Sequence, residues 1–162
     1  MPVEIERKFL VRSDAWKSAV TRVEHLHDGL VARFGEGKVR VRRAQGRAWI
    51  AIKGPRRGLT RPEYEYEIPL EDADEILRTM CQGPVIEKLR HCVLHDGRTW
   101  SVDVHTGRLA HVVLAEVELS YETERLDIPA WVGREVTHDP AYKKEALARQ
   151  LGGAGEGPGL SG

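Results

Sequence analysis

The sequence predicts a mainly β protein of the α+β class, built around one antiparallel sheet with a few amphipathic helices. Seven segments either alternate between charged and apolar residues or are rich in β-branched and aromatic residues, as strands are. Glycine or proline stands between many of these segments, which favours short connections between antiparallel neighbours. Helical spacing of apolar residues occurs in only a few stretches, so helices are expected to be the minor component.

The expected strands follow one another along most of the chain. The first contains VEIERKFLV, in which Glu4, Glu6 and Lys8 recur at the two-residue period of a strand and therefore share one face. The others are expected from the same alternation and from β propensity. In chain order, the seven expected strands are residues 3–11, 38–44, 47–54, 63–70, 85–94, 99–107 and 111–121.

Helices are expected where apolar residues recur at helical spacing, at residues 13–23, 70–82, 129–136 and 139–151. Ser13 is the expected N-cap of the first helix, and Asp139 followed by Pro140 is typical of a helix start. Residues 152–162 are rich in glycine and lack apolar anchors, so a disordered tail is expected there. We therefore expect one domain over residues 1–151.

Length and composition fit a single soluble domain. The chain has 162 residues and a mass of 18.3 kDa, which is enough to bury a core. Its 25 basic residues balance its 25 acidic residues, which argues against a general nucleic-acid-binding protein. No apolar stretch long enough to span a membrane and no apolar N-terminal signal segment is present, so a cytoplasmic location is expected. Cys81 and Cys92 lack the spacing of a metal site and are expected to be reduced thiols.

The expected sheet is charged on one face and apolar on the other. Lys38, Arg40 and Arg42, for example, lie opposite Val39 and Val41. A face that is merely solvated usually mixes both signs with neutral polar residues, whereas here several strands are purely cationic and others purely anionic. Like charges at every second position repel one another, so this pattern is unfavourable for folding alone. The same division holds for Lys53, Glu63, Glu65, Lys88, Arg90, Asp103, Glu116 and Glu118.

A bound ligand would offset this repulsion. Clustered cations favour a polyanion such as phosphate, and carboxylates beside them favour hard divalent cations that also bind phosphate oxygens. A sheet closed into a barrel would bring the charged faces together inside and leave the apolar faces outside for helices to cover. The simpler alternative is a sheet with one solvated face and no ligand.

The ordered set of charged segments resembles the CYTH superfamily, also called triphosphate tunnel metalloenzymes. The E-x-E-x-K signature of that superfamily matches Glu4, Glu6 and Lys8. The resemblance covers almost the whole chain, from EIERKFLV through VRVRRA, IKG, EYEYEIP, EKLR, WSVDV and AEVEL to EVTHDPAY. It implies a closed eight-stranded antiparallel β-barrel, with amphipathic helices packed outside, that binds a linear triphosphate together with Mg²⁺ or Mn²⁺.

The resemblance also implies roles for individual residues. The expected metal ligands are Glu4, Glu6, Asp103, Glu116 and Glu118. The expected phosphate-binding residues are Lys8, Arg40, Arg42, Lys53, Lys88 and Arg90. Glu63 and Glu65 are expected to orient these cations or to hold a second metal. The expected catalytic residues are Glu4, Glu6, Lys8, Lys88, Glu116 and Glu118.

The resemblance implies metal-assisted hydrolysis, with inorganic tripolyphosphate cleaved to pyrophosphate and phosphate as the leading reaction. The alternatives are an adenylate cyclase that converts ATP to cyclic AMP and pyrophosphate, a thiamine triphosphatase, and a polyphosphate-binding module without catalysis. Two features differ from the bacterial inorganic triphosphatases: Leu30 replaces an aromatic residue, and Lys143 and Lys144 occupy a helix that carries Asn there. The expected partner is a small triphosphate rather than a nucleic acid or a membrane, and the sequence leaves a homodimer open.

Overall fold

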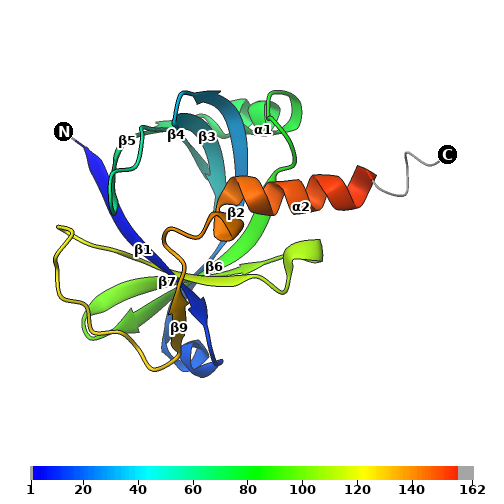
Figure 1. Ribbon diagram of the computed structural model, residues 1–162. Coiled ribbons are helices and arrows are strands. Elements are labelled where there is room, and N and C mark those ends of the chain that lie inside the picture. Colours follow the sequence, from blue (N-terminus) through cyan, green and yellow to red (C-terminus); the bar gives the residue numbers. More distant parts are fainter. Residues whose placement is uncertain (1, 157–162) are drawn as a thin grey trace.

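The computed structural model of the chain describes residues 2–156 (Figure 1). Its strands are β1 (Val3–Val11), β2 (Val20–Phe34), β3 (Gly37–Ala44), β4 (Arg47–Lys53), β5 (Thr60–Ile68), β6 (Ile86–His95), β7 (Arg98–His105), β8 (Val113–Glu118) and β9 (Val132–Glu135). Its α-helices are α1 (Leu70–Thr79) and α2 (Lys144–Glu156), and its 3₁₀ helices are η1 (Ala15–Ala19), η2 (Gly107–Leu109) and η3 (Pro140–Tyr142).

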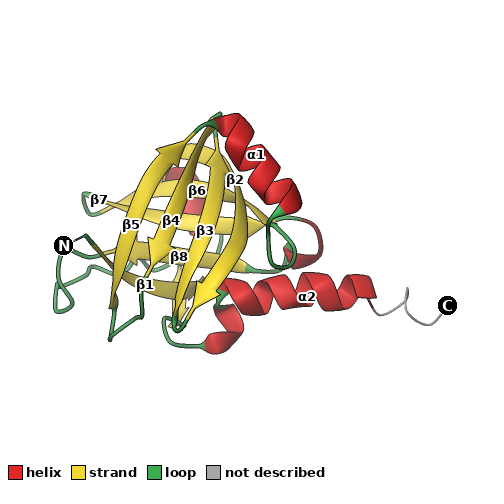
Figure 2. Cartoon of the chain, turned by 90° about the horizontal axis from the view of Figure 1, so that it is seen from above, coloured by secondary structure: helices red, strands yellow, loops and turns green. Residues whose placement is uncertain are grey.

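Eight antiparallel strands close into a barrel, as expected from the resemblance (Figure 2). Their order around the barrel is β5-β4-β3-β2-β6-β7-β8-β1, and pairing between β1 and β5 closes the ring. Strand β1 makes the closure by pairing at residues 3–5 with β5 and at residues 6–10 with β8. Strand β9 adds to β1 outside this ring.

The apolar core lies on the outside of the barrel wall, because the strands turn their charged faces inward. The largest cluster surrounds Trp100, whose ring centroid lies 5.6 Å from that of Phe9 and 5.8 Å from that of Trp131. Helix α1 buries Ala73 against Val41 and its neighbours on the outer surface of β3 and β4. Helix α2 contributes Leu147 to a third cluster. The interior is therefore left free for polar side chains.

Two expected helices are absent from the described residues, and both stretches form strands instead. Of residues 13–23 only the short η1 is helical, and β2 begins at Val20 and pairs with β6. The buried Trp16 anchors the turn, while the β-branched residues after it favour the extended chain. Of residues 129–136 the stretch from Val132 forms β9, because its backbone adds to the free edge of β1 while Val132 is buried.

The other two helical predictions are confirmed with shifted ends. Helix α1 ends at Thr79, and α2 begins after η3, where the Asp139 side chain accepts a hydrogen bond of 3.0 Å from the Ala141 N–H. Helix α2 extends to Glu156, so residues 152–156 are helical rather than part of a tail, and residues 157–162 lie outside the described residues. Among the described residues, no helix has the length and apolar character required to cross a membrane.

Candidate active site

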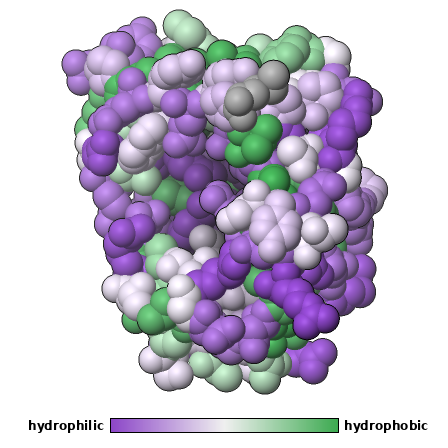
Figure 3. All heavy atoms as spheres, turned by 90° about the vertical axis from the view of Figure 1, so that its left-hand side faces the viewer, coloured by the Kyte–Doolittle hydropathy of each residue, from purple (hydrophilic) through white to green (hydrophobic). Residues whose placement is uncertain are grey.

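The barrel encloses a polar cavity of about 580 Å³. Twenty of its twenty-four lining side chains are charged, eleven of them basic and nine acidic. The space-filling view in Figure 3 shows a hollow with hydrophilic residues around and inside it. Most of the charges come from alternate positions of the strands, and the others come from connecting segments and from the start of α2. Such an interior suits a highly charged ligand.

Three carboxylates form an acidic cluster, defined as Glu4, Glu6 and Glu118. One oxygen from each lies within 4.8 Å of the others. The register of β1 and β8 places Glu6 opposite Glu118, and Glu4 lies two residues earlier on the same face of β1. Three carboxylate oxygens converging from two strands are the ligands that a hard divalent cation prefers, so this donor set fits such a metal.

The acidic cluster is held in an electrostatically strained state. Burial and the nearby Glu116 and Glu4 carboxylates raise the pKa of Glu6 to about 8. Burial and Glu4 also raise the pKa of Glu118. Burial opposes ionisation of Glu4 as well, but the Lys53 ammonium and the hydrogen bonds with Glu63 and Lys53 together outweigh it and lower the pKa of Glu4 to about 2. A bound cation would relieve the repulsion around Glu6 and Glu118.

Glu116, an expected metal ligand, lies beside the acidic cluster and joins it to the cations. Its carboxylate is 3.8 Å from Lys8 Nζ and 3.6 Å from Arg90 Nη2. These cations offset the desolvation of the carboxylate and lower the pKa of Glu116 to about 2. Glu116 is therefore ionised in the absence of metal and lies at the boundary between the acidic and basic parts of the cavity.

Arg40 is the most unusual cation of the cavity wall. Only 4% of its surface is exposed, yet its Nε and Nη1 atoms have no hydrogen-bond partner among the described residues. Burial lowers its pKa. Its neighbour on the same face, Arg42, is held by Asp28 through two hydrogen bonds of 2.9 and 3.2 Å. Because buried donors are rarely left unpaired, the Arg40 guanidinium is a strong indication of an anion-binding position.

Two expected site residues, Lys88 and Asp103, lie beneath the cavity wall rather than on it. They are 2% and 1% exposed, and neither lines the cavity. Asp103 accepts hydrogen bonds of 2.8 and 2.9 Å from Arg90 and lies 2.8 Å from Lys88 Nζ. Asp103 therefore lies among cations and is not part of the acidic cluster, although it was expected to bind metal together with Glu4, Glu6 and Glu118. It is positioned to orient Arg90, which does line the cavity.

Lys53, Glu63 and Glu65 line the cavity beside the acidic cluster. Lys53 Nζ lies 3.2 Å from Glu4 and 3.1 Å from Glu63, which fits the expected role of Glu63 in orienting a cation. The Arg56 side chain lies 3.4 Å from the other Glu4 oxygen. Glu65 forms no ion pair with the residues that the structure describes.

Sequence reasoning assigned no site role to several residues that complete the cavity. The first turn of α2 brings Lys144 and Glu145 to the wall, where Glu145 Oε1 lies 2.7 Å from Lys38 Nζ. Lys144 Nζ lies 3.4 Å from Asp28. Lys38 carried a usable signal, since it shares its face with Arg40. The positions of Lys144 and Glu145 depend on how α2 docks, which no local pattern encodes.

The chain is similar in sequence to known proteins over nearly its full length. The CYTH domain family matches residues 2–151. The inorganic triphosphatase of Acetivibrio thermocellus is 42% identical over 149 residues, covering 92% of this chain and 95% of the relative. The inorganic triphosphatase of Nitrosomonas europaea is 35% identical over 151 residues, covering 91% and 98% respectively.

Solved structures show the same arrangement. The crystal structure of an inorganic triphosphatase is 31% identical with a TM-score of 0.64, and the match covers 90% of this chain and 97% of that one. A Pyrococcus horikoshii protein, 19% identical with a TM-score of 0.57 over 74% of this chain and 80% of that one, shares the fold. From the family match over nearly its full length and from these relatives, the chain belongs to the CYTH domain family.

Proposed function

We propose that this protein is a divalent-metal-dependent hydrolase that cleaves inorganic tripolyphosphate to pyrophosphate and phosphate. The observation that carries the proposal is the buried guanidinium of Arg40, whose Nε and Nη1 atoms lack a hydrogen-bond partner among the described residues and whose ion pair with Glu145 is as long as 4.0 Å. It faces a cavity that also contains a cluster of three carboxylates. An anion is needed for the first and a cation for the second, and a metal-bound polyphosphate satisfies both. The two relatives named as inorganic triphosphatases support the same substrate.

The basic part of the cavity would bind the phosphate oxygens. Arg40 has free N–H groups, and a planar guanidinium matches two oxygens of one phosphoryl group. Arg42 and Arg90 are fixed in place by Asp28 and Asp103, so they offer their remaining donors in a set orientation. This preorganisation lowers the entropy lost when the substrate binds.

The acidic cluster of Glu4, Glu6 and Glu118 would hold Mg²⁺ or Mn²⁺, with Glu116 beside it. Both ions accept carboxylate, water and phosphate oxygens. Bound there, the ion would neutralise charge on the phosphate oxygens and favour ionisation of a nearby water. Asp103 is left out of this ligand set, because Lys88 and Arg90 occupy its two oxygens.

The reaction needs no side-chain nucleophile. A water oxygen forms a bond to a terminal phosphorus, the bond from that phosphorus to its bridging oxygen breaks, and pyrophosphate leaves with the electron pair. The proton of the water passes to the carboxylate-rich side of the cavity, while Arg40 and its cationic neighbours stabilise the charge on the transferred phosphoryl group. The chain's residues therefore bind, orient and accept a proton, in keeping with the largely electrostatic catalysis of phosphoryl transfer.

Selection of tripolyphosphate over a nucleotide follows from the lining. The four lining residues without charge are Gly37, Trp49, Ala51 and Thr137. Every other lining group recognises charge. We therefore expect ATP to bind through its phosphates alone and to turn over more slowly.

The test is product analysis with a panel of triphosphates in Mg²⁺ or Mn²⁺. We expect orthophosphate and pyrophosphate from tripolyphosphate at a higher rate than phosphate from ATP or thiamine triphosphate. Formation of cyclic AMP from ATP as the dominant product would identify a cyclase instead. Tight binding of tripolyphosphate without turnover in any metal would identify a binding module.

A further inference from the structure

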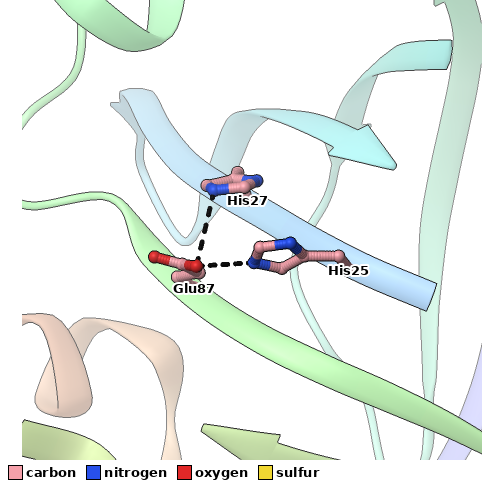
Figure 4. A group of neighbouring side chains, drawn as sticks. All are labelled: His25, His27 and Glu87. Atoms are coloured by element: carbon pink, nitrogen blue, oxygen red, sulfur yellow. Dashed lines mark hydrogen bonds and ion pairs between the residues drawn. The ribbon is translucent and has the colours of Figure 1, made fainter. Parts of the chain in front are cut away.

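A second group of metal-ligating side chains lies on the outer surface of the barrel, away from the tunnel. His25 and His27 project from β2 and Glu87 from β6, and the three side chains point toward one another (Figure 4). The antiparallel register pairs His27 directly with Glu87, and His25 lies two residues away on the same face of β2. Asp28, next to His27 in sequence, faces the tunnel interior, as the alternation of a strand requires.

The ligand atoms of this outer group lie close together. One atom from each residue lies within 4.8 Å of the others. His27 Nε2 lies 3.8 Å from Glu87 Oε1, near the separation of about 3.3 Å between two ligand atoms that each lie about 2.0 Å from a tetrahedral zinc ion. His25 Nε2 is hydrogen-bonded to the same oxygen at 2.5 Å, so zinc binding would replace this hydrogen bond and move the two atoms apart.

We propose that His25, His27 and Glu87 form a zinc-binding site that is separate from the acidic cluster of the tunnel. Two imidazoles and one carboxylate are ligands that Zn²⁺ accepts, with a water in the fourth position. Mg²⁺ prefers oxygen ligands throughout and would favour the tunnel instead. The two sites therefore differ in the metal that they prefer. The outer site offers two imidazole nitrogens and a carboxylate and suits Zn²⁺, whereas the tunnel site offers carboxylate oxygens and suits Mg²⁺.

The backbone around the outer site is fixed, so the ligands are presented in a set arrangement. Both histidines lie on a strand that is paired on its two sides, with β3 and with β6. The Glu87 carbonyl accepts hydrogen bonds of 3.2 Å from the Thr106 N–H and 3.3 Å from its hydroxyl. His25 retains 47% exposure of its side chain, which leaves an approach for the ion and for the water ligand.

A similar histidine elsewhere on the surface provides an internal comparison. His95 Nε2 lies 2.7 Å from Asp127 Oδ1, so this pair also joins an imidazole to a carboxylate. The described residues place no second histidine in that pair. Two ligands give much weaker chelation than three, and we therefore expect no zinc site at His95.

Zinc bound at the outer site would link the neighbouring strands β2 and β6 on the outer face of the barrel. These strands carry Asp28 and Lys88 on their inward faces, which lie 3.8 Å apart beneath and beside the substrate cavity. A ligand that binds the folded protein and not the unfolded chain raises the melting temperature. Zinc is therefore expected to stabilise the protein from a position that substrate does not occupy.

The experiment is a zinc titration of the intact protein in excess Mg²⁺, followed by calorimetry, with Co²⁺ absorption as a probe of tetrahedral coordination. We expect His25→Gln, His27→Gln and Glu87→Gln each to weaken zinc binding at least about tenfold. The matched controls His95→Gln, outside the site, and Glu118→Gln, in the tunnel, should bind zinc as the wild type does. Triphosphatase activity in Mg²⁺ should persist in the His25 and His27 variants and serves as the check on folding.

Two results would overturn the proposal. In the first, His25→Gln and His27→Gln fold and bind zinc with wild-type affinity. In the second, the tetrahedral Co²⁺ spectrum disappears only in Glu118→Gln, which would assign the ion to the tunnel. Failure of the outer site leaves hydrolysis of tripolyphosphate untouched, because that activity is measured separately in Mg²⁺.

Discussion

Lys144, the first residue of α2, places its Nζ 3.4 Å from Asp28 Oδ2 on β2. This ion pair ties the start of the C-terminal helix to the wall of the tunnel. Burial lowers the pKa of Lys144 well below its usual value, and the nearby cations Lys88, Arg42 and Arg40 add to the effect against the attraction of Asp28. Burial and these cations therefore disfavour the charged form of Lys144 in the ligand-free protein.

Replacing Lys144 with Met should raise the KM for tripolyphosphate several-fold, because the variant has no cation at this position to face the substrate. The melting temperature of the ligand-free protein should stay the same or rise, since repulsion from the other cations is removed and Arg42 still pairs with Asp28. Steady-state kinetics and thermal unfolding measure the two effects. Arg149→Met, at an exposed position of α2, is the control, and an unchanged KM in Lys144→Met would contradict the role of this residue.

Arg40→Ala should weaken tripolyphosphate binding, because two nitrogens of its buried guanidinium lack a hydrogen-bond partner among the described residues and are available to the substrate. Removing one charge-assisted hydrogen bond to the substrate costs about 1.5 to 3 kcal/mol, or roughly 10- to 150-fold in Kd. Calorimetric titration in Mg²⁺ provides the measurement. Arg47→Ala removes an exposed arginine that pairs with Glu67 and is not among the residues lining the cavity, and equal weakening in the two variants would argue against a specific anion site.

Glu118→Gln and Glu4→Gln should both abolish most activity but should change stability in opposite directions. The pKa of Glu118 is raised, so its charge destabilises the folded protein at neutral pH and its removal should raise the metal-free melting temperature. The pKa of Glu4 is lowered to about 2, so its charge contributes stability above the ordinary value of 4.5 that Gln cannot supply. Thermal unfolding at pH 7 in chelator separates the two, and melting shifts of the same sign would refute this account.

Metal binding should depend on pH through Glu6, whose pKa is raised to about 8 without metal. The stability that protonated Glu6 contributes to the metal-free protein is fully present below pH 4.5, the ordinary pKa of the group. It is lost as the pH rises to the folded-state pKa of about 8. A metal requires the carboxylate, so Mg²⁺ affinity should increase over the same window and protons should be released on binding. Calorimetry in two buffers that differ in ionisation enthalpy detects the release. Glu6→Gln should release none, and a pH-independent affinity in the wild type would exclude the mechanism.

Asp103→Asn should reduce activity by disordering Arg90 and Lys88, with no recovery when metal is raised. Breaking a buried ion pair costs about 3 to 5 kcal/mol, so urea denaturation should also show a large loss of stability. A metal ligand would behave differently, with activity partly restored by excess metal. Asp127→Asn, which removes an exposed partner of His95, is the control and should leave both measurements near wild type.

The charge alternation of the strands predicted much of the lining of the tunnel but not all of it. Glu4, Glu6, Arg40, Arg42 and Glu118 all project into the cavity, because a two-residue period leaves a strand only one choice of face. Closure of the sheet was not contained in that pattern and came from the resemblance to a family. The same pattern does not distinguish a metal-binding carboxylate from a carboxylate that pairs with cations. Asp103 was expected to be a metal ligand, and its neighbours in the structure are the cations Arg90 and Lys88.

Strand β2 is the largest element that sequence reasoning missed. Its first residues follow Trp16 at helix-compatible spacing, and Gly29 with Asp28 in its centre lowers its β propensity. Pairing on both sides, with β3 and β6, overrides this local preference. Because the strand was not assigned, the shared face of His25 and His27 could not be read from the sequence either. Residues 139–151 show the complementary limit, since a helix could be predicted there but not where it docks.

The closure of the barrel by β1 has a consequence for how the protein folds. Residues 6–10 of the N-terminal strand pair with β8, the last of the eight barrel strands to leave the ribosome. Glu6 and Glu118, paired across this seam, come from opposite ends of the domain. Pairing between such distant segments carries a large loop-closure entropy and makes folding slow. A nascent chain that does not yet include β8 would therefore lack Glu118 and the complete acidic cluster, and recovery of metal binding during refolding should coincide with pairing of β1 with β8.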